Sequence, residues 1–183
     1  MKAKLGTYLK TKSRCLMSLL CCFGVQWIAA QSIEENIETI KVGGVAEVYF
    51  TFGEPTEIKK EIYGKVVPEV ILEQKEGVFN VTTKGKAQGE VVKIYVSSPS
   101  LKNIIVNDRA QFHGTNTIES NTLRITSSDH GSVDLMVDSN EVHLFMDGGD
   151  IFISGTTNDC FIKIDETKTY GTINSANLNI KNL

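Results

Sequence analysis

Apolar and polar residues alternate along much of the chain, which is the pattern of β-strands that bury one face. Residues 45–52 (VAEVYFTF) and 91–96 (VVKIYV) are rich in the β-branched and aromatic residues that fit a pleated surface. Between them, the turn-like segment 74–77 divides two apolar runs and predicts a hairpin over residues 70–82. From Ile33 to Pro99, no set of apolar residues at helical spacing extends beyond two turns, so the sequence predicts an all-β domain.

After Pro99 the alternation becomes a pseudo-repeat with a period of 18 or 19 residues. Each unit opens with a triplet whose first and third residues are apolar, as in IIV at 104–106 and VHL at 142–144. Alternation places those two side chains on one face and the middle residue on the other. Because one unit is too small to bury its own apolar face, we expect the units to stack about 4.8 Å apart. The expected inner column consists of Ile104, Leu123, Val142, Cys160 and Leu178.

Units of this size are stable only as a stack. A fully buried Val, Leu or Ile side chain contributes about 1.5–3 kcal/mol, whereas ordering costs about 1–2 kcal/mol for each residue. Each unit has only two to four such side chains, so a single unit cannot offset the cost of its own ordering. We therefore expect residues 100–183 to form a coiled β-solenoid behind the N-terminal strands of residues 31–99, and the two parts to make one domain.

The first thirty residues follow a different pattern, typical of a signal peptide. Residues 1–14 carry five basic side chains and no acidic one, and the apolar stretch 15–28 is too short to cross about 30 Å of hydrocarbon comfortably. Cleavage is expected after Ala30, which gives an exported chain of residues 31–183. Lipidation is disfavoured because neither Cys21 nor Cys22 follows a small residue, and an uncleaved anchor stays open as an alternative.

The charge distribution bears on the kind of partner, and the cysteine content bears on how the exported domain is stabilised. The leader holds five of the 19 basic residues and none of the 22 acidic ones, so residues 31–183 carry 14 basic against 22 acidic side chains. The lysines are scattered among acidic residues, so nucleic acid is not an expected partner. Cys160 is the only cysteine after the leader, so we expect no disulfide within the exported domain and a fold that depends on its core.

Two segments resemble the bacterial head GIN domain family of auto-transporter adhesins, and the resemblance extends roughly over residues 33–183. Residues 37–52 (IETIKVGGVAEVYFTF) are similar to the family's opening strand, and residues 91–104 (VVKIYVSSPSLKNI) are similar to its strand, Pro, Leu and Ile pattern. The turns SDHG at 128–131 and DGGD at 147–150 depart from the family's S-G-S-G-D type. The resemblance implies a right-handed parallel β-helix in an exported protein and supplies no catalytic residues.

Acidic turn residues are the first candidates for a ligand site. If the turns stack, their carboxylates form a ladder of the kind that binds Ca²⁺. Tight turns select Asp and Gly for conformational reasons as well, and the glycine-rich Ca²⁺-binding repeat is absent, so the sequence predicts neither a metal nor a cofactor. The ladder consists of Asp129, Asp147, Asp150, Asp165 and Glu166, and the residues that we retain as candidates for ligand binding are Asp129, His130, Asp147 and Asp150.

The remaining candidates fit structural roles better than chemical ones. His113, His130 and His143 have no further ligand at zinc spacing. Cys160 takes the place of an aliphatic residue in the expected inner column, which favours a buried and inert thiol. Five aromatic residues suit either the stacking of sugar rings or the core, and core packing is favoured, although alternation points Tyr49 outward; they are Tyr49, Phe50, Phe52, Tyr63 and Phe79.

The sequence therefore favours an exported, non-enzymatic binding or adhesion module without catalytic residues, whose partner is a surface glycan or protein. We expect it in the periplasm, on the outer-membrane surface or outside the cell, with no membrane span in residues 31–183. Two alternatives stay open. One is a polysaccharide-degrading enzyme that uses stacked acids such as Asp147 and Asp150. The other is a self-assembling envelope protein whose open ends pair as homo-oligomers.

Overall fold

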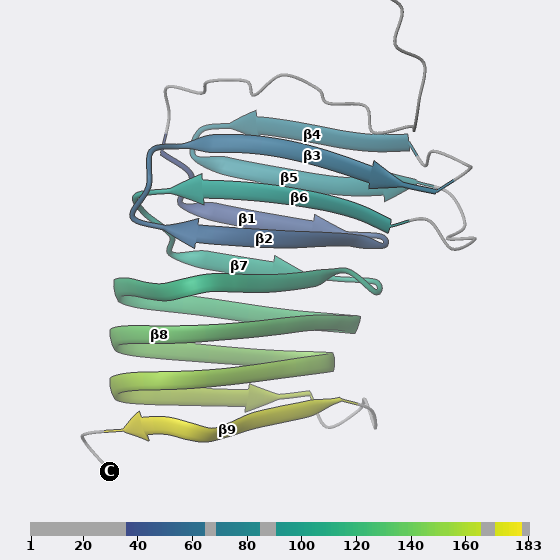
Figure 1. Ribbon diagram of the computed structural model, residues 1–183. Helices are drawn as coiled ribbons and strands as arrows, with labels where there is room; N and C mark the ends of the chain where they lie inside the picture. The colour runs from purple at the N-terminus through teal and green to yellow at the C-terminus, as the bar shows by residue number, and fades with distance from the viewer. Residues whose placement is uncertain (1–35, 65–68, 85–90, 166–170, 181–183) are drawn as a thin grey trace, which may run out of the picture.

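The computed structural model describes residues 36–64, 69–84, 91–165 and 171–180, which form β-strands and loops without a helix in these ranges (Figure 1). The all-β prediction is confirmed. The predicted signal peptide, residues 1–30, lies outside the described residues. The strands are β1 (Thr39–Gly43), β2 (Ala46–Phe52), β3 (Glu57–Tyr63), β4 (Glu69–Lys75), β5 (Val78–Lys84), β6 (Val91–Ser98), β7 (Asn103–Val106), β8 (Gln111–Ile164) and β9 (Thr172–Ile180).

The strands pair in one mixed sheet, so the predicted right-handed parallel β-helix is wrong. The strand order is β3-β6-β2-β8-β7-β1-β5-β4, with β9 paired to β8 outside this path. Seven strands, β1, β2, β5, β6, β7, β8 and β9, take part in parallel pairs, whereas β3 is antiparallel to β6 and β4 is antiparallel to β5. Side chains alternate in the same way in both kinds of strand, so the sequence pattern could not separate them.

The hairpin predicted over residues 70–82 is confirmed as β4 and β5. Lys75 pairs with Val78, which leaves a two-residue loop between the strands. The loop residues Glu76 and Gly77 have φ angles of 51° and 74°. Positive φ at both loop positions gives a turn whose twist matches that of the flanking strands.

The longest strand, β8, winds back and forth below β7 in successive passes (Figure 1). Side chains 18 or 19 residues apart meet across neighbouring passes. The Asn140 amide donates a hydrogen bond to Asn121 Oδ1 at 2.7 Å, and the Asn158 amide donates one to Asn140 Oδ1 at 3.0 Å. The spacing noticed in the sequence therefore corresponds to contacts between passes.

The pairing register differs from the single inner column expected from the sequence. Ile104, Leu123 and Val142 are fully buried, and Cys160 and Leu178 are half-buried and pack against the core. However, Ile104 pairs with Ile125, and Leu178 pairs with Gly155. The five residues therefore do not stand in one register, although all of them contribute to one core.

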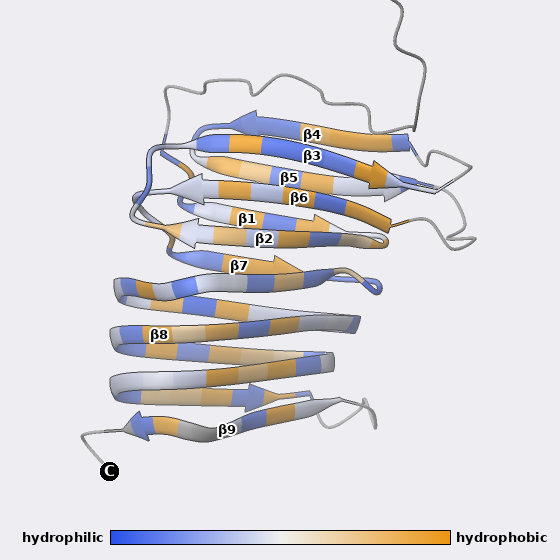
Figure 2. Cartoon of the chain, viewed as in Figure 1, coloured by the Kyte–Doolittle hydropathy of each residue, from blue (hydrophilic) through white to orange (hydrophobic). Residues whose placement is uncertain are grey.

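That core fills the space between the strands in front and those behind, and apolar and polar positions alternate along the ribbons (Figure 2). Phe50 of β2 and Phe112 of β8 are both fully buried, with ring centroids 5.9 Å apart. Phe79 of β5 is buried in the same cluster. Aromatic side chains bury more apolar area than other residues, so these three rings contribute strongly to stability.

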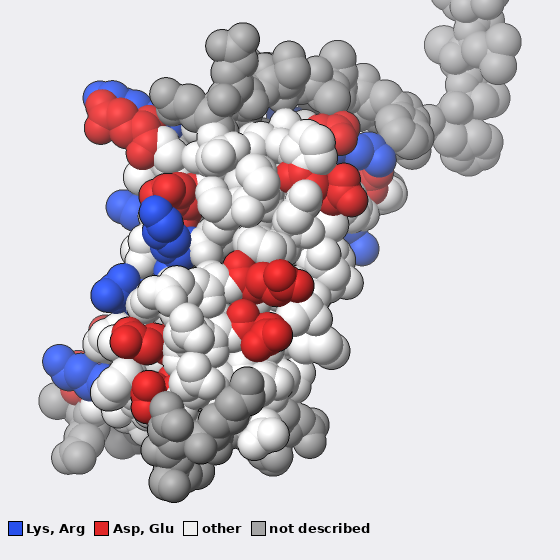
Figure 3. Space-filling view, turned by 90° about the vertical axis from the view of Figure 1, so that its left-hand side faces the viewer, with Lys and Arg blue, Asp and Glu red and all other residues white. Residues whose placement is uncertain are grey.

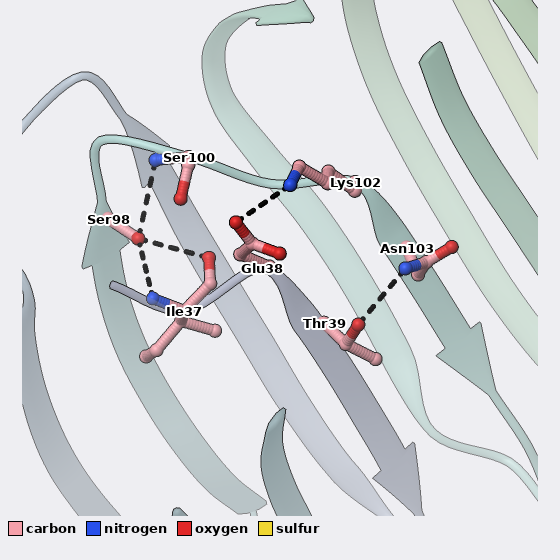
Figure 4. Close-up of polar contacts among 7 residues, drawn as sticks. All are labelled: Ile37, Glu38, Thr39, Ser98, Ser100, Lys102 and Asn103. Atoms are coloured by element: carbon pink, nitrogen blue, oxygen red, sulfur yellow. Dashed lines mark hydrogen bonds and ion pairs between the residues drawn. The ribbon is translucent and has the colours of Figure 1, made fainter. Parts of the chain in front are cut away.

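The start of β1 is fixed to the segment that joins β6 and β7 by a set of polar contacts (Figure 4). The fully buried Ser98 hydroxyl accepts a hydrogen bond from Ile37 N at 3.0 Å and donates one to Ile37 O at 3.1 Å. Nearby, Lys102 Nζ lies 2.7 Å from Glu38 Oε1, and the Asn103 amide donates to Thr39 Oγ1 at 3.1 Å. These contacts join segments more than 60 residues apart in the chain.

Candidate functional site

One outward face of the sheet carries a row of stacked rings across three strands. Tyr95 of β6 pairs with Tyr49 of β2, and Tyr49 pairs with His113 of β8. The ring centroids of Tyr95 and Tyr49 are 5.4 Å apart, and those of Tyr49 and His113 are 5.2 Å apart, with interplanar angles of 22° and 24°. We call these three residues the aromatic row. Because neighbouring rings cover each other's faces, the row presents ring edges and polar tips to solvent.

Charged side chains flank the aromatic row and hold it in place. Lys59 Nζ lies 5.4 Å from the Tyr95 ring centroid and 2.8 Å from a Glu61 carboxylate oxygen. The Lys93 ammonium group lies 5.3 Å from the Tyr49 ring centroid, and the Tyr49 hydroxyl donates a hydrogen bond to Glu47 at 3.1 Å. Cations over ring faces and the hydrogen bond to the carboxylate stabilise the outward orientation of the rings.

The same contacts shift the pKa values of ionisable side chains on this face. The hydrogen bond from Lys59 and a second one from Tyr63 lower the pKa of Glu61. The Glu61 carboxylate in turn raises the pKa of Lys59. Burial raises the pKa of Tyr49, and its hydrogen bond to Glu47 raises the pKa further. The Lys59–Glu61 pair therefore stays ionised and the Tyr49 phenol stays neutral around neutral pH.

A groove of about 750 Å³ lies beside the aromatic row, where the β2–β3 turn faces the end of β6. We call it the turn groove. Gly53 takes a φ of 87° at the start of the turn, and its N–H donates to Ser98 O at 3.1 Å. The Ser97 hydroxyl donates to Pro55 O, which ties the turn to β6. The groove is lined by Thr51, Glu54, Pro55, Thr56, Glu57, Lys59, Tyr95, Val96 and Ser97.

The turn groove combines one aromatic ring with hydroxyl, carboxylate and ammonium groups on a rigid sheet. Its volume falls in the range of about 300–1,000 Å³ that is usual for ligand sites. On the side of the molecule at which β2 and β6 end, acidic and basic side chains form small clusters, several of them of mixed charge, with uncharged surface between the clusters (Figure 3). Such a surface suits a polar ligand that uses hydrogen bonds more than a strongly charged one.

Comparison with known proteins places the chain in a family. Residues 36–183 match the family described as "Putative auto-transporter adhesin, head GIN domain". The chain belongs to this family. The resemblance that residues 37–52 and 91–104 indicate is thereby confirmed. The family description points to an exported or surface protein with binding partners.

Several solved structures have a fold similar to that of this head GIN domain. A "putative adhesin" from Bacteroides fragilis has a TM-score of 0.63 and 19% sequence identity, and the match covers 84% of this chain and 72% of the other. One from Parabacteroides merdae has a TM-score of 0.60 and 16% identity, covering 84% and 73%. One from Parabacteroides distasonis has a TM-score of 0.57 and 17% identity, covering 85% and 74%. No curated protein matches the sequence. These likenesses show a shared fold.

The acidic residues that the sequence singled out lie in turns of β8, away from the turn groove of the GIN domain. Asp129 and His130 are exposed and have φ angles of 49° and 71°. Asp147 and Asp150 are half-buried and flank two glycines of positive φ. Among the described residues, no three His, Cys, Asp or Glu side chains gather as a metal site. Asp165 is exposed, and Glu166 lies outside the described residues.

The aromatic candidates divide between core and surface. Phe50 and Phe79 are fully buried, Phe52 is half-buried, and Tyr63 is 44% exposed. Tyr49 points outward, as alternation predicted, and stands at the centre of the aromatic row.

Sequence reasoning missed Tyr95 in the aromatic row. Alternation in residues 91–96 already places the Tyr95 side chain on the face opposite to Ile94 and Val96, which are buried. Its neighbour across the sheet, however, is known only from the pairing of β6 with β2.

The two other candidates, His143 and Cys160, lie in surroundings that fit a structural role. His143 stacks on Phe161 at a centroid distance of 4.7 Å and has a ring nitrogen 3.3 Å from Glu141. Cys160 is half-buried, and burial raises the pKa of its thiol. A raised pKa reduces the thiolate fraction at neutral pH, so Cys160 has the character of an unreactive thiol.

Proposed function

We propose that this head GIN domain is an exported, non-enzymatic binding module of the cell envelope that holds a surface glycan or protein ligand in the turn groove. The observation that carries the proposal is the groove itself, which meets the aromatic row at Tyr95. Membership of an adhesin family supports a role in attachment. The ligand site is formed by backbone that other contacts already fix, so binding requires little ordering of the protein.

The proposal includes the location of the protein. The family description supports export, and the basic and apolar pattern of residues 1–30 supports a signal peptide that is cleaved after Ala30. Residues 31–183 then act as one domain in the periplasm, on the outer-membrane surface or outside the cell. Among the described residues, no helix is long and apolar enough to cross a membrane. Cell fractionation with N-terminal sequencing tests this part, and the expected first residue is Gln31.

A glycan array and a cell-adhesion assay with the exported chain test the binding role. We expect binding to at least one class of glycan or to cells, and loss of that binding in Tyr95→Ala and Lys59→Ala. Phe152→Ala is the matched control, because Phe152 is an aromatic residue of β8 that is 40% exposed and does not line the groove. Uniform absence of binding contradicts the proposed function. Binding that survives both groove substitutions contradicts the proposed site.

A further inference from the structure

A second groove lies where the connection between β6 and β7 meets residues 119–124 of β8. Its volume of about 300 Å³ is at the lower end of the range of about 300–1,000 Å³ that is usual for ligand sites. Among the described residues, it shares no lining residue with the turn groove. We call it the second groove. Phe52 gives it an apolar wall, and its polar lining consists of Lys102, Glu119, Ser120, Asn121, Thr122 and Arg124.

Backbone hydrogen bonds hold the two sides of the second groove in fixed positions. Arg124 N donates to Lys102 O at 2.8 Å, and Lys102 N donates to Glu38 O at 2.8 Å. Lys102 Nζ also lies 2.7 Å from the Glu38 carboxylate, so the charge of Lys102 is already balanced (Figure 4). Because these segments are fixed by their own contacts, binding a ligand between them requires little ordering of the backbone.

Two side chains of opposite charge line the second groove without an ion pair inside the described part of the chain. They are Glu119 and Arg124, and both are exposed. The planar guanidinium group presents N–H donors in a fork that fits a carboxylate, whereas an ionised carboxylate only accepts hydrogen bonds. The second groove therefore offers a site for an acidic group at Arg124 and a site for hydroxyl donors at Glu119.

A chain of amide hydrogen bonds ends at the second groove with its donor side. The Asn158 amide donates to Asn140 Oδ1 at 3.0 Å, and the Asn140 amide donates to Asn121 Oδ1 at 2.7 Å. Asn121 Oδ1 is thus engaged as an acceptor, and the Asn121 amide nitrogen has only a 3.5 Å contact to Thr122 Oγ1. Hydrogen bonds in such a chain polarise one another, which strengthens the donor at its end. Asn121 therefore adds N–H donors to those of Arg124.

We propose that the second groove binds an acidic sugar, whose carboxylate is held by Arg124 and Asn121 and whose hydroxyl groups donate to Glu119. An inorganic anion would use the same donors but would be repelled by Glu119. A neutral sugar gains nothing from the charge of the Arg124 guanidinium group. A uronic acid carries a carboxylate and hydroxyl groups on one ring, so it matches both charged side chains. The two grooves have different residues, so this proposal and the proposed function can fail separately.

The arginines give a direct probe of the site, because Arg109 and Arg124 are the only two in residues 31–183. We expect the NMR signal of the Arg124 Nε–H group to shift when the exported chain is titrated with oligogalacturonate. The Arg109 signal should stay in place, because Arg109 is exposed and does not line the second groove. The fully methyl-esterified form of the same oligosaccharide is the matched probe without charge, and it should shift neither signal at the same concentration.

Isothermal titration calorimetry with oligogalacturonate measures the contribution of each side chain. Arg124→Ala should raise the dissociation constant about tenfold or more, because it removes a charge-assisted pair of hydrogen bonds. Arg124→Lys keeps the charge but not the planar fork, so its loss should be smaller. Arg109→Ala removes the same charge elsewhere, and Tyr95→Ala alters the turn groove; both should bind like the wild type. Far-ultraviolet circular dichroism checks that every variant keeps the β fold.

The same measurements can overturn the proposal. Wild-type affinity in Arg124→Ala, or an equal loss in Arg109→Ala, shows that Arg124 does not hold the ligand. A loss of binding in Tyr95→Ala shows that the acidic sugar enters the turn groove instead. Equal binding of the methyl ester shows that the carboxylate is not recognised, and equal binding of polyglutamate or inorganic sulfate shows selection of charge alone. Absence of binding at millimolar oligogalacturonate overturns the proposal too.

Discussion

The hydroxyl group of Ser98 is hydrogen bonded to both backbone polar atoms of Ile37, a residue 61 positions earlier in the chain. Ser98 and Ile37 are both fully buried. Ser98→Ala removes both bonds and leaves buried backbone groups without these partners. A buried group without a partner costs about 1–3 kcal/mol, so we expect the free energy of unfolding to fall by at least that amount. Urea denaturation at neutral pH measures it.

A second serine close by provides the control for this experiment. The Ser100 hydroxyl is buried and has no hydrogen-bond partner among the described residues. Ser100→Ala therefore removes no bond, and we expect the free energy of unfolding to change by less than about 0.5 kcal/mol or to rise. Equal losses of stability in the two variants contradict the role given to Ser98.

Charge placed in the core between passes of β8 should unfold the chain. Val142 and Leu144 are fully buried, so Val142→Asp or Leu144→Asp buries a carboxylate without a partner and costs several kcal/mol. The outward Arg124 is exposed, and Arg124→Ala should change stability by less than about 0.5 kcal/mol. Thermal unfolding followed by circular dichroism checks this contrast. Comparable melting temperatures in the two kinds of variant contradict the inward direction of Val142 and Leu144.

Two glycines of positive φ should differ in their tolerance of alanine. At Gly155, with a φ of 112°, an added Cβ meets the backbone of Val137 in the neighbouring pass. At Gly53, with a φ of 87°, nothing lies within 4 Å of an added Cβ. Gly53→Ala should cost about 1–2 kcal/mol from backbone strain alone. Gly155→Ala adds overpacking, for a total of about 2–5 kcal/mol. The urea midpoints of the two variants measure the difference. Equal midpoints would contradict the close contact between Gly155 and Val137 in neighbouring passes.

Acid should remove the contribution of Glu61 to stability. Lys59 and Tyr63 lower the pKa of Glu61 in the folded chain below its ordinary value of 4.5. The folded state therefore binds the proton less readily than the unfolded state. The resulting stabilisation is complete above pH 4.5 and is lost as the pH falls through the lowered pKa. Glu61→Gln should reduce the urea midpoint at neutral pH and have a smaller effect in acid. Glu73→Gln, at an exposed position of β4, is the control for the loss of one surface carboxylate.

Cys160 should react slowly with alkylating reagents. Burial raises the pKa of its thiol above the ordinary value of 9.0, so less thiolate is present at any given pH. We measure the rate of iodoacetamide alkylation at Cys160 as a function of pH by mass spectrometry of its peptide. The rate should rise at a higher pH than it does for a small free thiol. In urea, which unfolds the chain, the rate should rise at the same pH as it does for the free thiol. Fast alkylation of the folded chain at neutral pH contradicts the half-buried position of Cys160.

Local features of the fold follow from the sequence, and the pairing of distant strands does not. The β4–β5 hairpin is predictable because its turn residues and both of its strands lie within 16 residues. The burial of Leu123 and Val142 follows from alternation. The mixed sheet does not, because β3 reverses against β6 over an intervening hairpin, and no local pattern records that direction.

The candidate site illustrates the same limit. Tyr49 is recognisable as outward from alternation alone, but the aromatic row depends on the register that brings Tyr95 and His113 beside it. The turn groove depends on the turn at Gly53 and on its bond partners in β6. The acidic turn residues are candidates because carboxylates can bind metal ions. Among them, Asp129 has a positive φ angle, which gives a conformational reason for Asp at that position.

The antiparallel strands β3 and β4 occupy the two ends of the strand order, and Figure 1 places both at the same end of the molecule. The turn groove lies at β3, far along the strand order from β9. At that end the antiparallel strands β3 and β4 flank the parallel strands β6 and β5. The residues that line the turn groove all precede β8 in the chain. Insertion or deletion of one pass of β8 would therefore change the length of the molecule and leave the turn-groove residues untouched.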